Sequence, residues 1–409
     1  MKKPIHIAAS PNVERDDVMI AIRNIFRPWS WESNKHIGSL KGEISSYFET
    51  EDVCLFDSGR SAITAVLHGF GIGAGDEVLV HAFTCLVVAN PVSWVGAKPI
   101  FVDVNPKNFN FDIDDLKRKI TSRTRAVIVQ HSFGIPEDID VIRKIVGAKV
   151  MIIEDLAHSL GSSFKGRKLG INGDATILTF GIEKVISSVR GGAGIIFNKD
   201  AMDKMMVEYL ALPSFPRGLT FIALLNPIFW WLVLPVYYFG FGVFTLGRMK
   251  VFLAHRIGLL GRMIEKSEYG GSKPKWMPAK ISPALAELGL NQWKKMKKLN
   301  THRENISKIY SQELGVNYDG ATSLLRFPVL VKNRAELIKT TKAKGIVLGD
   351  WYKKILYAPQ ETLDHLGYKA GSCPNAEKIK DQIVNLPTYI GVKEKDAKVI
   401  ANMVRPFLN

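Results

Sequence analysis

The sequence contains little cysteine and lacks the composition of a disordered chain. Cys54, Cys85 and Cys373 stand far apart among 409 residues, which excludes a disulfide framework and a CxxC zinc pattern, so we expect no metal. Hydrophobic residues make up 46% and charged residues 23%, which excludes a low-complexity chain. The opening residues MKKPIHIAASPNVERDD lack the apolar core of a signal peptide. We therefore expect a folded cytoplasmic protein of two or three domains, and an enzyme.

Acidic residues are outnumbered by basic ones. Lys and Arg total 55 against 39 Asp and Glu, which leaves a net charge of +16. This surplus favours an anionic partner, such as a nucleic acid, a membrane surface or a phosphorylated substrate. One basic run surrounds Trp293 and consists of Lys294, Lys295, Lys297 and Lys298. It has the pattern of an amphipathic helix, so we interpret it as a solvated helix face and expect no nucleic-acid partner.

Apolar, β-branched segments bounded by Gly, Asp or Asn recur through the first half of the chain. They cover residues 77–81, 98–104, 125–131, 149–155, 175–180 and 193–198, with helical patterns at 112–120 and 138–146. Such alternation predicts βαβ units and a parallel sheet covered on both faces. Ligands of these sheets bind beyond the carboxyl ends of the strands. Asp155, His158 and Lys184, which follow two of the segments, are therefore candidate site residues.

These residue types match the needs of pyridoxal phosphate (PLP). A lysine amine bonds to the cofactor and then moves protons, and a carboxylate keeps the pyridine nitrogen protonated. The small-residue turn SGRSA (58–62) opens an apolar helical pattern, whose first N–H groups would bind the phosphate. Each residue also has an ordinary interpretation: Lys184 as a solvated lysine, Asp155 as a strand-end cap and His158 as a packed histidine.

A set of motifs in one order runs through most of the chain outside one uncharged segment. They are FDSGRSAI (56–63), GAGDEVLVHAFTCLVVAN (73–90), GAKPIFVDVNP (96–106), TSRTRAVIVQHSFGIPEDID (121–140), IIEDLAHSLGSSFKGRKLGINGDA (152–175), TFGIEKVISSVRGGAGIIFN (179–198), KISPALAELGLNQWKKM (280–296) and PNAEKIKDQIVNLPTYIGVKEKDA (374–397). Together they resemble the DegT/StrS-type sugar aminotransferases, which are PLP enzymes of fold type I.

The resemblance implies an α/β fold with a large and a smaller domain, and the break in composition adds an insertion between them. Residues 1–210 would form the large PLP-binding domain around a mostly parallel seven-stranded sheet. Residues 211–264 would be a hydrophobic insertion with basic flanks, and residues 265–409 a smaller C-terminal α/β domain.

The resemblance also implies the roles of individual residues. Lys184 would bond to the cofactor, Asp155 would pair with the pyridinium nitrogen, and His158 would approach the ring hydroxyl. The phosphate would be bound by residues of the helix start and of a neighbouring strand, namely Gly59, Arg60, Ser61 and Thr179.

Three departures from the family pattern concern the cofactor contacts. Arg60 stands at a family threonine, whose hydroxyl Ser61 or the guanidinium would replace. Cys85 stands at a family aromatic residue, so either Phe83 covers the cofactor ring or that face is less well packed. The alternative interpretation of Cys85 is a buried apolar filler of the core. Pro278-Ala279-Lys280 replaces a family N-x-R motif that reaches the neighbouring subunit, which makes Lys280 a candidate substitute.

The resemblance implies a two-step amine transfer within a homodimer. Glutamate or glutamine would give its amine to the cofactor, and a keto sugar, activated by a nucleotide, would receive it for surface-glycan synthesis. Tyr352 is a candidate sugar contact. Relatives that dehydrate sugars carry histidine in place of the lysine, so Lys184 favours transamination. A PLP-dependent dehydratase or epimerase and a non-catalytic, membrane-associated sensor or scaffold remain as alternatives.

The uncharged segment, residues 218–247, is long enough to cross a bilayer, which takes about 20 apolar residues. No acidic residue stands between Glu208 and Glu265. A single crossing would separate Lys184 from the C-terminal part, and the family builds one site from both. Pro227 and Pro235 would break a straight helix. We therefore expect a re-entrant or interfacial hairpin at the membrane, or else a segment buried in a subunit interface or lid.

Overall fold

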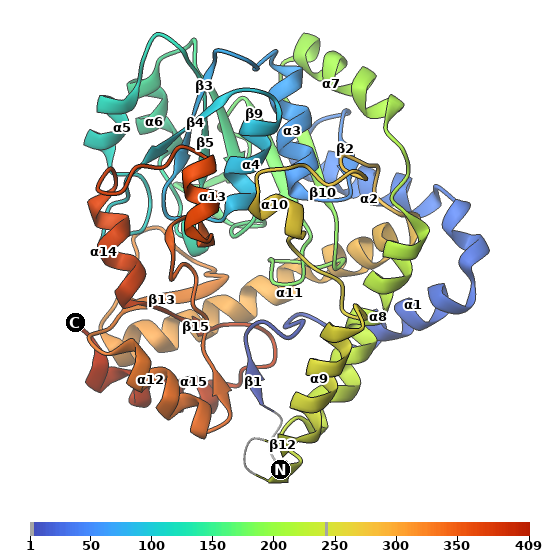
Figure 1. The fold of residues 1–409 in the computed structure, drawn as a ribbon, viewed down its shortest axis with the longest axis vertical. Helices are drawn as coiled ribbons and strands as arrows, with labels where there is room; N and C mark the ends of the chain where they lie inside the picture. The colour runs from blue at the N-terminus through green and yellow to red at the C-terminus, as the bar shows by residue number, and fades with distance from the viewer. Residues whose placement is uncertain (1–3, 242–243) are drawn as a thin grey trace.

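The computed structural model describes residues 4–241 and 244–409 and is built around one large sheet (Figure 1). The sheet has seven strands in the order β2-β10-β9-β6-β5-β3-β4. Strand β10 runs antiparallel to both of its neighbours, while the other adjacent pairs are parallel. The predicted mostly parallel sheet is confirmed. Its strands are β2 (Cys54–Phe56), β3 (Glu77–His81), β4 (Lys98–Val102), β5 (Thr124–Gln130), β6 (Met151–Asp155), β9 (Ala175–Thr179) and β10 (Gly192–Ile196).

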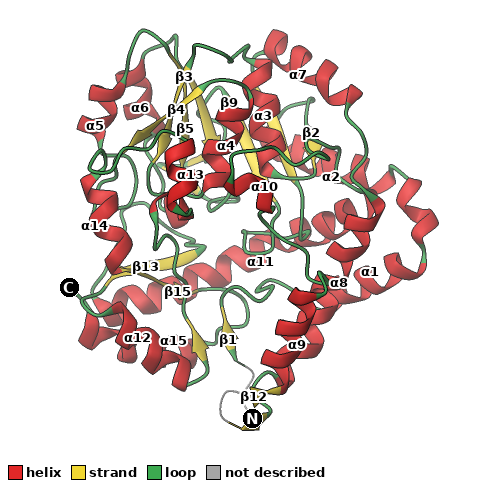
Figure 2. Ribbon diagram, in the orientation of Figure 1, coloured by secondary structure: helices red, strands yellow, loops and turns green. Residues whose placement is uncertain are grey.

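Both faces of this sheet are covered by helices, as Figure 2 shows. In β3, Val78 and Val80 belong to one apolar cluster and Leu79 to another, because successive side chains of a strand point to opposite faces. All residues of β3 are buried, which explains why its sequence is apolar without alternation. The covering helices are α3 (Gly59–Gly69) and α4 (Leu86–Trp94) on one face, and α5 (Ile113–Lys119), α6 (Ile139–Val146), α2 (Lys35–Phe48) and α11 (Pro283–Leu314) on the other.

The C-terminal part contains a smaller two-stranded sheet, flanked by helices. Strands β13 (Arg326–Leu330) and β15 (Ile383–Pro387) pair antiparallel. The chain start joins this part, because β1 (Ile5–His6) pairs with β14 (Ile346–Val347). The smaller α/β unit that we predicted is therefore present, although it includes an N-terminal strand. Its helices are α12 (Arg334–Ala343), α13 (Gln360–His365), α14 (Pro374–Gln382) and α15 (Glu394–Val404).

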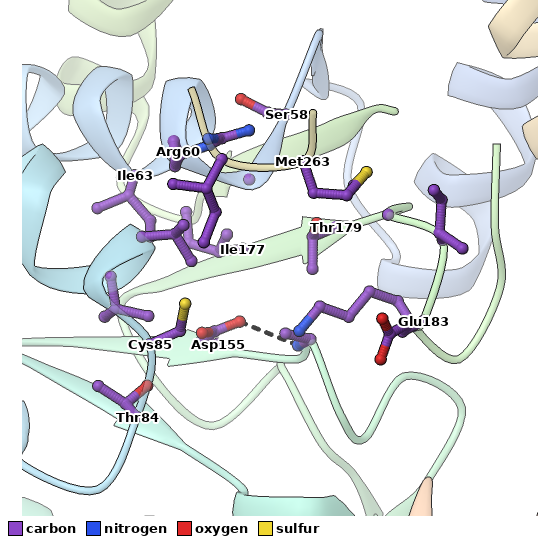
Figure 3. A pocket seen from close by; sticks show the side chains of 18 of the residues that line it. Ser58, Arg60, Ile63, Thr84, Cys85, Asp155, Ile177, Thr179, Glu183 and Met263 are labelled. Carbon is purple, nitrogen blue, oxygen red and sulfur yellow. Dashed lines mark hydrogen bonds between the residues drawn. The ribbon is translucent and has the colours of Figure 1, made fainter. Parts of the chain in front are cut away.

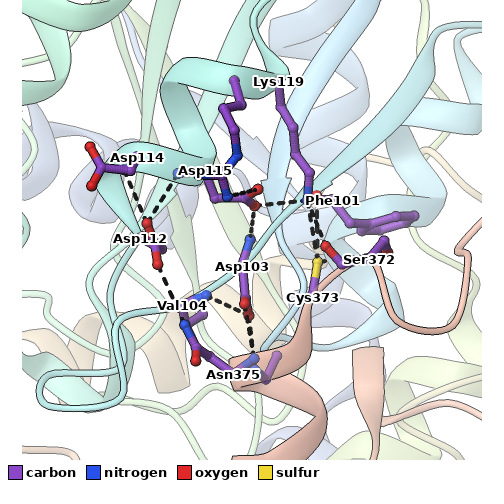
Figure 4. Close-up of polar contacts among 12 residues, drawn as sticks. Phe101, Asp103, Val104, Asp112, Asp114, Asp115, Lys119, Ser372, Cys373 and Asn375 are labelled. Atoms are coloured by element: carbon purple, nitrogen blue, oxygen red, sulfur yellow. Dashed lines mark hydrogen bonds and ion pairs between the residues drawn. The ribbon is translucent and has the colours of Figure 1, made fainter.

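A polar cluster joins this part to the edge of the large sheet (Figure 4). The Asp103 carboxylate accepts hydrogen bonds from the backbone N–H groups of Asn375 and Ala376, at 2.9 and 2.8 Å. These N–H groups lie in the first turn of α14, where a carboxylate supplies acceptors that the helix itself lacks. Lys119 Nζ also donates to the Ser372 carbonyl, at 3.0 Å. The contact fixes the C-terminal part beside the carboxyl end of β4.

The uncharged segment and the basic residues that follow it fold as a helical hairpin. Helix α8 (Arg217–Val233) runs into a short 3-10 turn, and α9 (Leu246–Arg256) returns beside it (Figure 1). Two short strands, β11 (Gly240–Phe241) and β12 (Phe244–Thr245), lie at the hairpin tip. One helix, Arg217–Val236, is long and apolar enough to cross a membrane, and 44% of its apolar window is buried.

One face of α8 is packed inside the protein, against α1 (Arg15–Phe26). Its buried residues recur at helical spacing, for example Thr220, Ala223 and Trp230. Our prediction that Pro227 breaks the helix is wrong, because α8 continues through this residue and ends at Val233. Pro227 is itself buried in the packed face, so the packing compensates for the backbone hydrogen bond that a proline removes.

Candidate active site

A cavity lies at the carboxyl ends of β6 and β9 and beside the first turn of α3 (Figure 3). Figure 3 shows Ser58 and Arg60 at one end of it, Asp155 and Cys85 at the other, and Thr179 between them. Most of the predicted site residues line this cavity: Gly59, Arg60, Cys85, Asp155, Thr179, Lys184 and Tyr352. Residues that the sequence analysis did not identify also line it: Gln130, Arg190, Met263 and Trp351. Ser61, His158 and Lys280 are not among the lining residues.

Lys184 lies in the turn that follows β9. Its backbone is held by Gly181, whose carbonyl accepts from the Lys184 N–H at 3.2 Å, and by the Asn12 amide, 2.7 Å from the Lys184 carbonyl. The Nζ atom lies 4.9 Å from the centre of the Trp351 ring. Burial lowers the pKa of Lys184, while the negative charge of Asp155 opposes that change. The amine is thus closer to the neutral form, which is the nucleophile, than a solvated lysine would be.

Asp155 is the last residue of β6 and is almost fully buried. Its Oδ1 atom accepts a hydrogen bond from the Ala157 N–H at 2.9 Å. Burial raises the pKa of this carboxyl, and the charge of Lys184 opposes the rise. A carboxylate in such surroundings is stabilised by a cation, and a protonated ring nitrogen is one.

The first turn of α3 provides an anion-binding end. Ser58 caps the helix by accepting from the Ser61 N–H at 3.3 Å, and the Gly59 and Arg60 N–H groups have no partner within the helix. Strand β10 passes directly beneath this turn: a Cβ atom on Gly192 would lie 2.6 Å from the Ser58 carbonyl carbon and 2.7 Å from the Gly59 nitrogen. Only glycine permits that approach. Ser61 itself is engaged elsewhere, because its hydroxyl donates to Asp57 at 2.7 Å.

The Arg60 side chain forms an ion pair with a carboxylate that the sequence did not predict. Its Nη1 atom lies 2.5 and 2.6 Å from the two oxygens of Glu268, in α10 (Lys266–Tyr269). Both side chains are buried. We predicted that the Arg60 guanidinium could replace the hydroxyl of the family threonine as a phosphate contact. Because the guanidinium is paired with Glu268, the geometry does not support this prediction. The pair joins positions 208 residues apart, and no local pattern of the sequence signals it.

His158 lies behind two aromatic rings. Its Nδ1 atom accepts from the Phe133 N–H at 3.1 Å, and its Nε2 atom is 3.3 Å from the Tyr352 hydroxyl. Its ring stacks on Trp351, with 5.1 Å between the centres. Burial holds the pKa of His158 well below its usual value, so the ring is neutral. With Nδ1 as acceptor, the proton is on Nε2, which donates to Tyr352. His158 thus positions the aromatic wall of the cavity.

Gln130, the last residue of β5, places its side-chain amide in the cavity, near the Tyr352 hydroxyl. Its Oε1 atom accepts from the Thr84 hydroxyl, and its Nε2 atom is buried without a hydrogen-bond partner in the described structure. The neighbouring residue His131, which ends one of the predicted apolar segments, does not line the cavity. His131 is buried and bonds to Glu154 at 3.2 Å, which is a structural contact.

Two further predicted residues lie differently from what the family pattern implies. Phe83 packs on Tyr352, with 5.5 Å between ring centres, and does not line the cavity, whereas Cys85 does. Burial raises the pKa of the Cys85 thiol, which keeps it protonated. Lys280 Nζ donates to the Leu210 carbonyl at 2.8 Å, outside the cavity.

The residues present fit PLP. The cavity holds a buried amine, a buried carboxylate and a helix start whose first N–H groups have no partner within the helix. It also holds buried polar atoms without partners among the described residues, namely Asp57 Oδ2, Gln130 Nε2 and Arg190 Nη1. Buried polar groups are normally paired, so this set indicates a polar ligand. No group of three or more His, Cys, Asp or Glu side chains that could hold a metal occurs within residues 4–241 and 244–409.

Comparison with known sequences identifies a family that matches this chain and proteins that are similar to it. The model of the DegT/DnrJ/EryC1/StrS aminotransferase family matches residues 13–216 and 261–405. The chain is 24% identical over 401 residues to a "Pleiotropic regulatory protein" of Geobacillus stearothermophilus, covering 96% of this chain and 95% of that protein. It is 29% identical over 198 residues to the GDP-perosamine synthase of Caulobacter vibrioides, covering 48% of this chain and 53% of that enzyme.

Solved structures share the fold over nearly the whole chain. DesI in the presence of its TDP-sugar product matches with a TM-score of 0.72 and 18% identity, covering 99% of this chain and 93% of DesI. NtdA from Bacillus subtilis with bound cofactor PMP matches with a TM-score of 0.73 and 20% identity, covering 99% of this chain and 86% of NtdA. The matched stretches of the family model leave out residues 217–260, which contain α8 and α9.

Proposed function

The chain belongs to the DegT/DnrJ/EryC1/StrS aminotransferase family, and on that premise we propose that it moves an amino group from glutamate or glutamine to a nucleotide-linked keto sugar. As a member of this family it is a PLP-dependent transaminase. The observation that carries the proposal is the burial of the Lys184 amine beside the Asp155 carboxylate, in one cavity at the first turn of α3. The sugar acceptor is supported by relatives named GDP-perosamine synthase.

Each residue of the site has a separate task in this reaction. When bound, PLP supplies the electron sink for the carbon that loses or gains a proton. Lys184 Nζ holds and returns that proton, and Asp155 provides the charge that keeps the ring nitrogen protonated. The N–H groups of Gly59 and Arg60, with the Thr179 hydroxyl, hold the phosphate. Trp351 and Tyr352 exclude water from the amine.

The test is the visible absorbance of the protein with PLP, before and after glutamate. We expect a band of lysine-bound cofactor that glutamate, or glutamine, removes. Lys184→Ala should lack the band, whereas the exposed Lys144→Ala on α6 should keep it. A band that neither donor changes would contradict transamination and favour a dehydratase, an epimerase or a sensor. Absence of any band in the wild type would favour the non-catalytic scaffold.

The acceptor is tested separately, because amine exchange with glutamate does not identify it. The aminated cofactor form of the enzyme is mixed with nucleotide-linked keto sugars, and the return of the original band is followed. We expect a nucleotide-linked sugar to restore the band faster than the same sugar without its nucleotide. This order would fit a role in making surface glycans, and the reverse order would contradict a nucleotide-linked acceptor.

We further propose that the active form is a homodimer with its catalytic parts in the cytoplasm. An exposed apolar group on and after α1 supports a subunit contact: Met19, Phe26 and Trp29 are 56%, 74% and 68% exposed. Apolar groups of this kind mark interaction sites. Sedimentation should give twice the chain mass, and Phe26→Arg with Trp29→Arg should give a monomer. A wild-type monomer would contradict the proposal.

The outer face of α9 supports contact with a membrane. Its exposed residues Met249, Phe252 and Leu253 are 55%, 67% and 56% exposed and recur at helical spacing. Lys250 and Arg256 are exposed on the same helix, and no acidic residue stands between Glu208 and Glu265. An apolar face flanked by basic residues is typical of a helix lying at an anionic lipid surface. We propose that the hairpin lies on the membrane surface. We also propose that residues 1–210 act as the catalytic domain, residues 211–264 as the hairpin and residues 265–409 as the small domain.

Vesicle cosedimentation tests the membrane contact. The protein should pellet with vesicles of phosphatidylcholine and phosphatidylglycerol, and less with phosphatidylcholine alone. Phe252→Ser with Leu253→Ser should abolish pelleting, whereas Val399→Ser, which is 52% exposed on α15, should leave it unchanged. Equal pelleting of all three proteins, or none by the wild type, would contradict the contact.

A further inference from the structure

The phosphate end of the cavity contains a buried arginine that has no assigned role. Arg190 immediately precedes Gly191 and Gly192, and the start of α3 packs against Gly192. Its side chain is 7% exposed, and it lines the cavity together with Ser58, Gly59 and Thr179. A guanidinium beside a helix start adds full positive charge to an end that already carries the partial charge of the helix.

One side of this guanidinium is fixed by the protein, and the other is free. Nη2 donates to the Arg262 carbonyl and lies 3.4 Å from Glu265 Oε1. The guanidinium carbon is 5.2 Å from the centre of the Trp276 ring. Nη1, by contrast, is buried and has no hydrogen-bond partner among the described residues. An unpaired buried donor is costly, and a ligand that supplies an acceptor removes that cost.

The neighbouring charges leave Arg190 as the cation available to a ligand. Arg60 is the other arginine of the cavity, and its Nη1 is paired with both oxygens of Glu268. Asp57 is buried nearby, its Oδ1 atom accepts from the Ala279 N–H at 2.8 Å, and its Oδ2 atom has no hydrogen-bond partner among the described residues. Burial raises the pKa of this carboxyl, which reduces its negative charge beside a bound anion. Glu265 is 25% exposed and contacts Nη2, not Nη1. A dianionic group at the start of α3 would therefore contact one charged donor without a hydrogen-bond partner among the described residues, namely Arg190 Nη1.

We propose that Arg190 Nη1 binds the phosphate of PLP, next to the N–H groups of Gly59 and Arg60. The carbonyl of Arg262 and the carboxylate of Glu265 hold the guanidinium in place. Both belong to residues 262–268, which follow the hairpin and which we call the strap. Arg190 thereby supplies, within one chain, a phosphate contact in place of the N-x-R motif that Pro278-Ala279-Lys280 lacks. The inference rests on the binding of PLP and not on the sugar or the amine donor.

The test compares two cofactor forms that differ only in the phosphate. Dissociation constants of PLP and of pyridoxal are measured on the apoprotein by absorbance titration, for the wild type, Arg190→Gln, Arg190→Lys and Lys144→Ala. We expect Arg190→Gln to weaken PLP binding about 10- to 100-fold, as for loss of a charge-assisted hydrogen bond, without changing pyridoxal binding. Arg190→Lys should retain part of the preference for PLP, and Lys144→Ala all of it.

Two outcomes of this titration would overturn the proposal. If Arg190→Gln weakened PLP and pyridoxal equally, Arg190 would only support the strap and Trp276. If neither affinity changed, Nη1 would not reach the phosphate. If Arg190→Gln fails to fold, the proposal is tested with Arg190→Lys and inorganic phosphate. Phosphate should raise the melting temperature of the wild-type apoprotein more than that of Arg190→Lys. Equal rises would overturn the proposal. No amine donor is present, so failure of the transamination test leaves these results interpretable.

Discussion

Two regions of this protein contain many apolar residues but differ in where those side chains lie. In the central sheet, every residue of β3 and of β10 is buried. In the α8–α9 hairpin, one face of α8 packs on α1, while Phe252 and Leu253 of α9 are 67% and 56% exposed. Apolar composition alone therefore does not show whether a segment belongs to the core. The sheet has helices on both faces, whereas the outer face of α9 has no covering element in the described structure.

The largest effect is expected at the buried ion pair of Arg60 and Glu268, which joins helix α3 on the sheet to the strap that follows the hairpin. Glu268→Gln would leave the Arg60 charge buried without its partner, which costs about 3–5 kcal/mol of unfolding free energy. Denaturant unfolding measures the loss, with the exposed Glu361→Gln as a control. The double variant Arg60→Met with Glu268→Leu should recover most of the stability, because an apolar pair needs no charge partner. A loss below about 1 kcal/mol for Glu268→Gln would mean that the strap opens to water.

A matched pair of leucines tests the comparison directly. Leu79→Ala in β3 removes a fully buried side chain and should cost about 2–5 kcal/mol of unfolding free energy. Leu253→Ala on α9 should change that free energy by less than about 0.5 kcal/mol, because the side chain is exposed. If the two variants lost similar stability, the face of α9 would be covered in solution, and a second copy of the chain would be its partner instead of a membrane.

Much of the sheet could be predicted from the sequence, because buried parallel strands have continuous apolar segments. The predicted segment 77–81 is β3 residue for residue, and 175–180 differs from β9 by one residue. Strand β2, Cys54–Phe56, was not predicted, since three residues carry no periodicity. The path of α8 through Pro227 was also missed, because it depends on packing against α1.

The site residues also fall into those that the sequence predicts and those that it does not. Lys184 and Asp155 could be identified because strand ends and ordered motifs mark them, and the structure brings both into one cavity. The roles of Arg190 and Glu268 could not, since they depend on the strap, which is far from the other cavity residues in the sequence. Gln130 was not predicted, because it ends an apolar segment and only the fold places its amide in the cavity.

A smaller effect is expected from the basic residues of the hairpin. Each Lys or Arg near an anionic lipid surface contributes about 1 kcal/mol of binding free energy, which is about fivefold in affinity. Lys250→Gln and Arg256→Gln should therefore each weaken binding to phosphatidylglycerol vesicles by about that factor, and added salt should reduce the difference. The exposed Lys144→Gln is the control. Unchanged affinity in both hairpin variants would mean that apolar contact alone holds the protein.

The smallest change is expected in the pKa of Lys184, which lies in the buried cavity at the edge of the central sheet. Burial lowers the pKa of Lys184, and the Asp155 carboxylate raises it. In Asp155→Asn the opposing charge is absent, so the pKa of Lys184 should fall further. Since the neutral amine is the form that attacks an aldehyde, the rate at which pyridoxal bonds to the apoprotein should rise with pH. Its midpoint should lie at lower pH in Asp155→Asn than in the wild type, as followed by absorbance across a pH series. A midpoint that stays, or moves to higher pH, would show that the two groups do not interact, and that Asp155 acts on the cofactor alone.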